Sequence, residues 1–436
     1  MKQEDWLFWI WLAQAFGAGN GEFRALLGMY DTPYNIFSAP AEELERLDCV
    51  SDRVKAALSE KNLGEASRIA DACDRLGIGI LTFHSPLYPQ LLREIKNPPL
   101  LLYYLGSVPG FDRMPSIAMV GTRRMSAYGM RTAYKIAYEL SAVGMTVISG
   151  MAAGIDGVCA VATLEAGGFP VAVLGCGLDR AYPTQHAPLM RAIAKHGLLL
   201  SEYPPGDKPV SYHFPVRNRL ISALSQGVVV VEAGLGSGSL ITAKEAVLQG
   251  KEVFAVPSGA DGIGEAGAEN LLRDGAQFAS RSEDILGRYL YLFADRLRPD
   301  LLHAAEGRSG VNTEALERYG VLNRQTVILK RTDSRPNPAP IGTRAQVVPE
   351  PPKPREAARL TAQPKPVPQV PSSELPAGLS PVGKRLMERL AAAGKAVPLD
   401  ELVDAEVSYG QALSELTLLE LQGCVAKQPG GLYRKI

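Results

Sequence analysis

The chain has 436 residues, of which 46 are Lys or Arg and 46 are Asp or Glu, so its formal net charge at pH 7 is +0. This balance excludes a globally basic surface, and any anion-binding surface must therefore be local. Hydrophobic residues make up 46% of the chain, as expected of a globular protein with two or three domains.

Five cysteines are scattered along the chain, and none of them forms a C-x-x-C pair. The odd number and the spacing argue against a disulfide framework and against a zinc cluster. Small buried side chains in a reducing cytoplasm are the favoured interpretation. We expect no metal and no cofactor.

The first predicted element is an apolar helix from Trp6 to Phe16. It is too short to span a bilayer, and Glu4 and Asp5 precede it where a signal peptide has basic residues, so we expect a cytoplasmic protein. Short helical patterns continue to residue 80 and predict a small helical domain. The amides of the turn from Gly17 to Gly21 could bind a DNA backbone, but packing is the favoured role.

Residues 86–295 are predicted to form an extended α/β core. A strand at residues 100–105 is followed by apolar strands that alternate with helical segments. Near-continuous apolar runs are typical of strands buried on both faces, so we predict a Rossmann-like, mostly parallel sheet with helices on both faces. The predicted strands are residues 117–120, 146–148, 171–174, 197–200, 227–231 and 252–256. The predicted helices are residues 129–143, 157–166, 186–196, 220–225 and 239–248.

Residues 301–376 are predicted to be a linker, because 12 of the 32 prolines fall between Pro336 and Pro376. The remaining residues, 377–436, show three helical patterns at 380–392, 399–403 and 409–422. Two strands follow at 424–428 and 432–435, around a Pro-Gly-Gly turn. This order predicts a winged-helix domain, a module that binds either duplex DNA or protein.

The first strand of the core ends in VGTRRMSAYG, with a helix after it. Gly121 allows a tight turn, Thr122 and Ser126 offer hydroxyl groups, and Arg123 offers a planar cation suited to phosphate. The segment is not G-x-G-x-x-G, and no ribose-binding acid follows the second strand, so dinucleotide binding is disfavoured.

Two further loops follow the second and third strands. SGMAAGIDG places Gly150 and Gly154 at the top of the sheet, where the backbone can approach a ligand closely. Asp156 is expected to cap the following helix. In LGCGLDRAYP, Cys176 has no His near it in sequence, and we expect a spectator rather than a nucleophile.

The segment HFPVRNRLISALS contains an aromatic residue beside two guanidinium groups, at the entrance to a predicted helix. Phe214, Arg217, Asn218 and Arg219 have the chemistry that binds single strands, namely base stacking and phosphate pairing. A core phenylalanine with solvated ion pairs is an equal alternative from these residues alone.

The segment VVVEAGLGSGSLITAKEA ends another strand with Glu232 and continues through a glycine-rich turn. Gly236, Ser237 and Ser239 lie at the mouth of the next helix, where they could cradle a phosphate. The segment lacks the G-K-[ST] ending of a P-loop, so triphosphate hydrolysis is not supported. Four such loops at one edge of a sheet would form a polar floor suited to an extended phosphodiester chain.

Together these motifs resemble the DprA/Smf family of DNA-processing proteins. The matching blocks occur in the family's order over residues 86–290: YPQLLREIKNPPLLLYYLG, IAMVGTRRMSAYG, ISGMAAGID, LGCGLDRAYP, SEYPPG, FPVRNRLISALS, VVVEAGLGSGSLITAKEA and VFAVPS. The resemblance implies a Rossmann-like core that binds single-stranded DNA and delivers it to RecA in natural transformation. It further implies a homodimer, no chemical reaction, an N-terminal SAM-like domain and a C-terminal winged helix.

The resemblance places the family's DNA pocket on two segments of this chain. These are the Gly-Thr-Arg loop, with Gly121, Thr122, Arg123 and Ser126, and the Phe-Pro-x-Arg-Asn-Arg segment, with Phe214, Arg217, Asn218 and Arg219. The chain departs from the family at two places. Gly157-Val158 stands where members usually carry Ala-His, and Val256-Pro257-Ser258 replaces the usual Val-Pro-Gly.

Two other functions are compatible with these patterns. A nucleoside-monophosphate phosphoribohydrolase on a related core would use Glu232 as a base, but its Pro-Gly-Gly-x-Gly-Thr-x-x-Glu loop is absent here. Alternatively, the chain could be a scaffold whose winged helix alone binds a partner.

Overall fold

The structure is a computed structural model that describes residues 3–257, 266–322 and 380–394 continuously, with a minority of the residues between 397 and 435. The chain divides into two compact units, Met1–Asn337 and Pro338–Ile436. Within the described part of the chain, no helix has both the length and the apolarity needed to cross a membrane.

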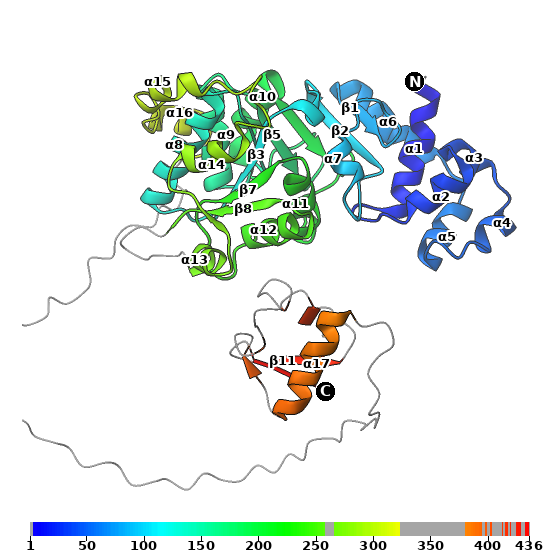
Figure 1. Ribbon diagram of the computed structural model, residues 1–436. Helices are drawn as coiled ribbons and strands as arrows, with labels where there is room; N and C mark the ends of the chain where they lie inside the picture. Colours follow the sequence, from blue (N-terminus) through cyan, green and yellow to red (C-terminus); the bar gives the residue numbers. More distant parts are fainter. Residues whose placement is uncertain are drawn as a thin grey trace, which may run out of the picture. The chain divides into compact units, whose positions relative to one another are not determined.

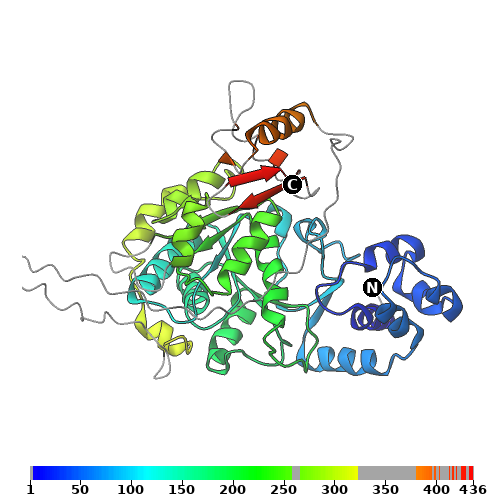
Figure 2. The ribbon, with the colours of Figure 1, turned by 90° about the horizontal axis from the view of Figure 1, so that it is seen from below.

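Helices form the N-terminal part of the first unit, beside the edge of the sheet that carries β1 and β2 (Figures 1 and 2). They are α1 (Gln3–Phe16), α2 (Phe23–Tyr30), α3 (Pro33–Ser38), α4 (Ala41–Glu45), α5 (Asp52–Ser59) and α6 (Gly64–Leu76). Buried Ile10, Leu12 and Phe23 belong to their shared core. The apolar segment predicted at the start of the chain is therefore the central helix of this part.

The glycine turn after α1 packs against the α/β core. Gly19 has φ +83°, a conformation that glycine adopts readily, and a Cβ there would lie 2.8 Å from the Val216 side chain. The Gly19 amide donates a hydrogen bond to Glu202 Oε1 at 3.1 Å. The predicted packing role of this turn is confirmed, and the Gly19 amide is hydrogen-bonded to the Glu202 carboxylate.

The described residues of the first unit contain a nine-stranded sheet of order β1-β2-β6-β5-β4-β3-β7-β8-β9. Strands β3 to β9 pair in parallel, while β2 is antiparallel to both β6 and β1, so the predicted mostly parallel sheet is confirmed. The strands are β1 (Gly79–Thr82), β2 (Leu101–Gly106), β3 (Ser116–Val120), β4 (Thr146–Ser149), β5 (Pro170–Leu174), β6 (Leu198–Ser201), β7 (Gly227–Val230), β8 (Glu252–Ala255) and β9 (Gln277–Phe278).

Helices cover both faces of this sheet, as predicted (Figure 1). Alternate strand residues face different cores: in β3, Ile117 and Met119 face one core, and Ala118 and Val120 face the other. The first core is covered by α8 (Ala127–Ala142), α9 (Ile155–Glu165), α10 (Ala187–His196) and α14 (Ser282–Tyr289). The second is covered by α7 (Gln90–Arg93), α11 (His213–Ala223), α12 (Ser239–Leu248) and α13 (Ala266–Arg273). Short 3₁₀ turns are η1 (Phe111–Arg113), η2 (Thr184–His186) and η3 (Pro299–Leu301).

The helix predicted from residue 220 begins seven residues earlier, at His213. Pro215 lies in its first turn, where a backbone N–H has no intrahelical acceptor, so the proline does not interrupt the helix. As a consequence, Arg217, Asn218 and Arg219 lie inside α11 rather than at its entrance.

The linker predicted from residue 301 is wrong over residues 301–322. Helices α15 (Leu302–Glu306) and α16 (Thr313–Arg318) pack against α8 and α9, with Leu316 and Val321 buried. Each helix is too short to show a clear periodic pattern in the sequence. The rest of the predicted linker, residues 323–376, lies outside the described residues.

The described part of the second unit is a helix with a three-stranded antiparallel sheet. Helix α17 (Pro381–Ala393) begins where the Ser380 hydroxyl accepts from the Gly383 amide at 2.9 Å. The strands are β10 (Val397–Pro398), β11 (Val425–Gln428) and β12 (Leu432–Lys435), in the order β10-β12-β11. The predicted first helix and both predicted strands are confirmed. The predicted helices at 399–403 and 409–422, like the Pro-Gly-Gly turn, fall largely outside the described residues.

Candidate nucleic-acid interface

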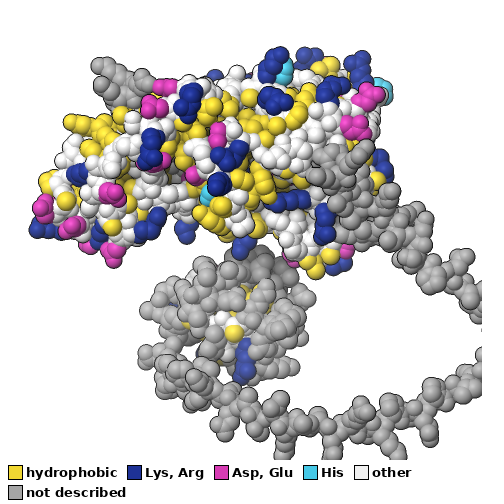
Figure 3. All heavy atoms as spheres, turned by 180° about the vertical axis from the view of Figure 1, so that it is seen from behind, with side chains coloured by type: hydrophobic (Ala, Val, Ile, Leu, Met, Phe, Trp, Pro, Cys, Tyr) yellow, Lys and Arg dark blue, Asp and Glu magenta, His cyan; other side chains and the backbone are white. Residues whose placement is uncertain are grey.

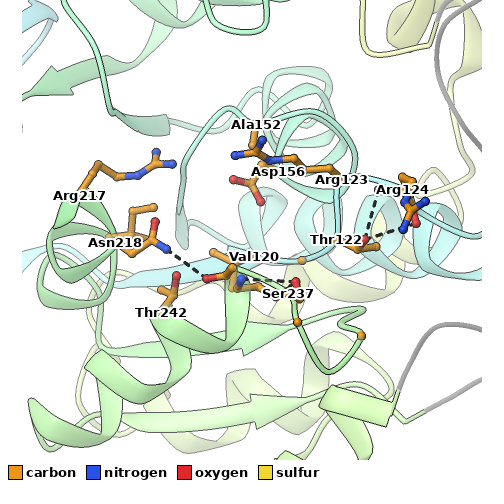
Figure 4. Close-up of a pocket in the computed structure, with 16 residues that line it drawn as sticks. Val120, Thr122, Arg123, Arg124, Ala152, Asp156, Arg217, Asn218, Ser237 and Thr242 are labelled. Atoms are coloured by element: carbon orange, nitrogen blue, oxygen red, sulfur yellow. Dashed lines mark hydrogen bonds between the residues drawn. The ribbon is translucent and has the colours of Figure 1, made fainter. Parts of the chain in front are cut away.

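The sheet reverses its direction of growth at β3. The chain adds β4, β5 and β6 on one side of this strand and then returns to add β7 and β8 on the other. Ligands of open α/β sheets bind at such a switch point, beyond the carboxyl ends of the strands. Here the loops after β3 and β7 form two walls of a crevice of about 500 Å³ (Figure 4). It is lined by Val120, Gly121, Thr122, Arg123, Arg124, Ala152, Asp156, Arg217, Asn218, Ile221, Gly234, Gly236, Ser237, Gly238, Ser239 and Thr242.

The loop after β3 is held by the end of β7. The Thr122 amide donates to the Glu232 carbonyl at 2.8 Å, and Ser126 donates to the Glu232 carboxylate from both its amide and its hydroxyl, at 3.0 and 3.1 Å. The Ser126 hydroxyl also accepts from the Gly129 amide at the start of α8. Ser126 therefore caps a helix and is absent from the crevice lining, while Thr122 and Arg123 lie in it.

The loop after β4 forms the back of the crevice through backbone contacts. Gly150 donates its amide to Asp156 Oδ2 at 3.1 Å, and a Cβ on Gly154, which has φ +81°, would lie 2.3 Å from the Thr122 carbonyl oxygen. The expectation that Asp156 caps a helix is wrong, because Asp156 lies within α9 and Gly154 is the N-cap residue. Burial raises the pKa of the Asp156 carboxyl, and the Arg217 guanidinium opposes that shift.

The loop after β7 forms the opposite wall. The hydroxyls of Ser237 and Ser239 are hydrogen-bonded to each other at 2.7 Å, and the Gly238 carbonyl accepts from Asn218 Nδ2 at 3.2 Å. Gly236 is exposed, and the N-terminus of α12 is directed at the crevice through Ser239 and Thr242. This wall therefore offers hydroxyl groups and a helix terminus to an anion.

Arg217 is the deepest cation of the crevice, with 4% of its surface exposed. Its Nη1 donates to the carbonyls of Gly150 and Val173, while its Nε has no hydrogen-bond partner among the described residues. Burial lowers the pKa of this guanidinium to about 10, so Arg217 still carries its charge at neutral pH.

Phe214 forms an aromatic and cationic cluster beside the crevice. The Arg123 and Arg217 guanidinium carbons lie 5.2 and 5.9 Å from its ring centroid, and the Tyr182 ring lies 5.2 Å away. Phe214 is half-buried rather than fully exposed, because Tyr182 and the two arginines cover much of its ring. The cluster combines a π-face with two cations, the set that stacks bases and pairs phosphates.

Comparison with known proteins places these features in a family. The family model "DNA recombination-mediator protein A" matches residues 79–290, and the model "DprA winged helix domain" matches residues 370–431. The DNA processing protein DprA of Bacillus subtilis is 38% identical over 238 residues, which cover 54% of this chain and 80% of the relative. Protein Smf of Synechocystis is 34% identical over 290 residues, covering 66% and 73%.

The chain belongs to the DprA/Smf family. Its fold is also similar to the X-ray structure of DprA from Streptococcus pneumoniae, with a TM-score of 0.56 and 31% identity over 64% of this chain and 97% of the other. The α/β core and the C-terminal winged helix are thus those of a DNA-processing protein family.

Arg219 takes no part in the crevice of this DprA/Smf member. Its Nη2 donates to both carboxylate oxygens of Glu202 at 2.8 Å, and its Nε donates to the Asn97 carbonyl at 2.9 Å. Residues two positions apart on a helix face different directions, so Arg217 and Arg219 cannot share one site. Arg219 therefore lies outside the crevice that Arg217 lines, and its role in DNA binding stays a prediction.

Of the other predicted site residues, the crevice brings together Gly121, Thr122, Arg123, Arg217, Asn218, Gly236, Ser237 and Ser239. Gly150 and Gly154 shape the loop behind it, and Phe214 lies at its side. Sequence reasoning missed the other eight lining residues, which are Val120, Arg124, Ala152, Asp156, Ile221, Gly234, Gly238 and Thr242. Ile221 and Thr242 follow Asn218 and Ser239 by three residues, so the helical repeat could have revealed both.

Two groups that an enzyme of this DprA/Smf fold could use, Glu232 and Cys176, are held in other roles or states by their surroundings. Glu232 is 1% exposed and accepts hydrogen bonds from Ser126, which leaves it poorly placed as a base for a phosphoribohydrolase. Burial raises the pKa of the Cys176 thiol to about 11, so this side chain is not a thiolate at neutral pH.

Basic side chains are dispersed over the α/β core on the face shown in Figure 3, rather than gathered in one large patch. This dispersal agrees with the neutral net charge. On this face, electrostatic attraction of an anion therefore depends on local groups rather than on one broad basic surface.

Proposed function

We propose that this chain binds single-stranded DNA across the switch-point crevice, protects it, and delivers it to RecA in transformation or recombination, without catalysing a reaction. The observation that carries the proposal is the cluster of Arg123, Phe214 and Arg217 at the crevice. An aromatic ring flanked by guanidinium groups binds a strand whose bases are unstacked. The relatives named as DNA processing proteins support DNA as the ligand.

Phosphate groups of the bound strand would contact the two walls of the crevice. Thr122 and Arg123 on one wall and Gly236, Ser237 and Ser239 on the other provide donors along the edge of the sheet. Binding should therefore weaken steeply as the salt concentration rises, because phosphate contacts release counterions.

RecA and a second copy of the chain are the partners that the DprA/Smf resemblance implies. The absence of catalysis is supported by the engagement of Glu232 with Ser126 and by the protonated state of Cys176.

A duplex keeps its bases stacked and paired, so it cannot place them on Phe214 without the cost of unpairing.

The test is fluorescence anisotropy of the full chain with a labelled single strand and with the matching duplex, across a salt series. We expect tight, salt-sensitive binding that favours the single strand. Arg123→Ala should weaken this binding and flatten its salt dependence, whereas Arg191→Ala, an exposed residue of α10, should leave both unchanged. Equal affinity for strand and duplex, or binding lost when residues 376–436 are removed, would contradict the proposal.

A further inference from the structure

We propose that the crevice seats one nucleoside 5′-monophosphate, either the 5′-terminal nucleotide of a DNA strand or a free nucleotide. If the ligand is the end of a strand, this inference rests on the proposed function and specifies that the 5′-terminal nucleotide of the DNA enters the crevice. For a free nucleotide it adds a small-molecule ligand that would compete with DNA.

The charge of the lining favours a phosphate monoester over a diester. Three guanidinium groups, those of Arg123, Arg124 and Arg217, line the crevice beside a single carboxyl group, that of Asp156, so positive charge predominates there. A phosphodiester carries a single negative charge, whereas a phosphate monoester carries about −1.5 to −2 at pH 7. A terminal phosphate therefore offsets more of the positive charge of the lining than an internal phosphate does.

The buried arginine supplies a second, independent observation. Arg217 is 4% exposed and its Nε is without a hydrogen-bond partner among the described residues, although a buried donor normally has one. Figure 4 shows this side chain extending from α11 toward the wall that carries Asp156 and Arg123. The guanidinium is thus placed to complete its hydrogen bonding with an entering ligand.

The size and the floor of the crevice match one nucleotide rather than a bare phosphate. Its volume of about 500 Å³ lies within the range of roughly 300–1,000 Å³ that holds small organic ligands. Val120 and Ile221, 3% and 1% exposed, supply apolar surface on which a base or sugar can lie. Thr122 and Ser237 lie on opposite walls and offer hydroxyls to the phosphate (Figure 4).

The burial gradient of the lining indicates that a strand enters by one end. Asp156, Arg217, Ile221 and Thr242 are buried, whereas Arg123, Arg124 and Gly236 are exposed at the mouth. A chain running through the crevice would need two open ends. A single terminal unit can be enclosed while the adjoining nucleotides remain outside, beside Phe214.

The test is competition against a 3′-labelled single strand bound to the full chain, read by fluorescence anisotropy. The competitors are dAMP, deoxyadenosine, inorganic phosphate, and unlabelled oligonucleotides with a 5′-phosphate or a 5′-hydroxyl. We expect dAMP to compete at concentrations at least about tenfold below those of deoxyadenosine and phosphate, because charge-assisted hydrogen bonds to the phosphate add to base burial. A matching advantage of the 5′-phosphorylated oligonucleotide assigns the ligand to strand ends, and its absence assigns it to free nucleotides.

A matched pair of variants links the effect to the crevice. Arg124→Gln removes an exposed lining charge and should abolish most of the advantage of dAMP over deoxyadenosine. Arg191→Gln removes an exposed charge outside the lining and should preserve it. Direct calorimetric titration of dAMP into the full chain gives the same comparison without DNA.

The outcomes separate this inference from the proposed function. Tight strand binding with no competition by dAMP and no effect of a 5′-phosphate overturns the inference alone. Inorganic phosphate competing as well as dAMP also overturns it, because the site would then recognise phosphate only. Calorimetric binding of dAMP without any strand binding supports the nucleotide site and overturns the proposed function.

Discussion

At the scale of single residues, helix α11 separates two arginines that are near neighbours in sequence. Phe214, Arg217, Asn218 and Ile221 follow the spacing of one helical face, and this face turns toward the crevice. Arg219 faces another direction and pairs with Glu202, where the two side chains are 9% and 7% exposed. Arg217 therefore lines the crevice, whereas Arg219 forms a buried ion pair that stabilises the fold.

Arg219→Ala should destabilise the protein rather than remove a DNA contact. It leaves the buried Glu202 carboxylate without its cation, a loss that typically costs about 3–5 kcal/mol. Urea unfolding followed by circular dichroism measures it. Arg273→Ala, which breaks the exposed pair with Glu269, should cost no more than about 1 kcal/mol. Equal midpoints for the two variants would contradict the structural role.

Phe214→Ala should weaken single-strand binding by about 1–3 kcal/mol, since one base loses its stacking partner. The loss should be similar for all base sequences, because every base has a π-face. Anisotropy titrations with several homopolymers test this. Tyr212→Ala, an exposed aromatic two positions away and outside the crevice lining, is the control and should bind normally. A loss confined to one homopolymer would argue for base readout instead.

His186 should make stability sensitive to mild acid. Its Nδ1 donates to the Met151 carbonyl at 3.1 Å, and burial lowers its pKa below the ordinary 6.5. Because the unfolded chain takes up the proton first, the free energy of unfolding falls as the pH drops from 6.5 through the lowered pKa. Urea unfolding at several pH values should show the wild-type advantage over His186→Gln shrinking in that window. A constant difference would mean that His186 does not titrate differently on folding.

At the scale of elements, the crevice depends on glycines that let loops of neighbouring strands touch. Gly154 combines φ +81° with a close approach to the Thr122 carbonyl, whereas Gly167 has φ +71° with nothing within 4 Å of its virtual Cβ. An alanine at residue 154 would meet both backbone strain and a steric collision, whereas an alanine at residue 167 would meet backbone strain alone.

Gly167→Ala should cost about 1–2 kcal/mol from the left-handed conformation alone. Gly154→Ala should cost more and should also weaken DNA binding, because the loop after β3 must shift away from the new methyl group. Urea unfolding and anisotropy together test this. Equal stabilities with unchanged affinity would show that the two loops do not need this contact.

The order of strands and helices in the core was predictable, because buried parallel strands are continuous apolar runs such as Val228 to Val231. Strands β1 and β9 were not predicted: β1 begins where the predicted helical region ends, and the two residues of β9 are exposed. The site was predicted where a glycine loop ends a strand, as at Gly121 and Gly236. Arg219 was grouped with Arg217 because the helix was predicted to begin only at residue 220, which left the directions of the two side chains in α11 undetermined.

At the scale of the molecule, the first unit extends beyond the last strand of its sheet. Helices α15 and α16 cover α8 and α9, and the hydroxyls of Ser282 and Ser309 donate to the buried Glu139 carboxylate at 2.8 Å each. Residues 302–322 are therefore part of the folded core.

A chain ending at residue 322 should be as stable as the first unit of the full protein, whereas one ending at residue 300 should be less stable. The shorter chain exposes the surface that Leu316 and Val321 cover, worth roughly 1.5–3 kcal/mol for each side chain. It also removes Ser309 from Glu139. Thermal unfolding of both chains measures the difference, and coincident transitions would show that this segment contributes nothing.

Gly157 has a consequence for how this protein can evolve. A Cβ at this position would lie 2.8 Å from His186 Cε1 and 3.1 Å from Val321 Cγ2. An alanine here, the residue that the family resemblance leads one to expect, would require the His186 ring and the Val321 side chain to shift. Whether an alanine at residue 157 is tolerated therefore depends on the residues at positions 186 and 321, so substitutions at these contacting positions should have non-additive effects on stability.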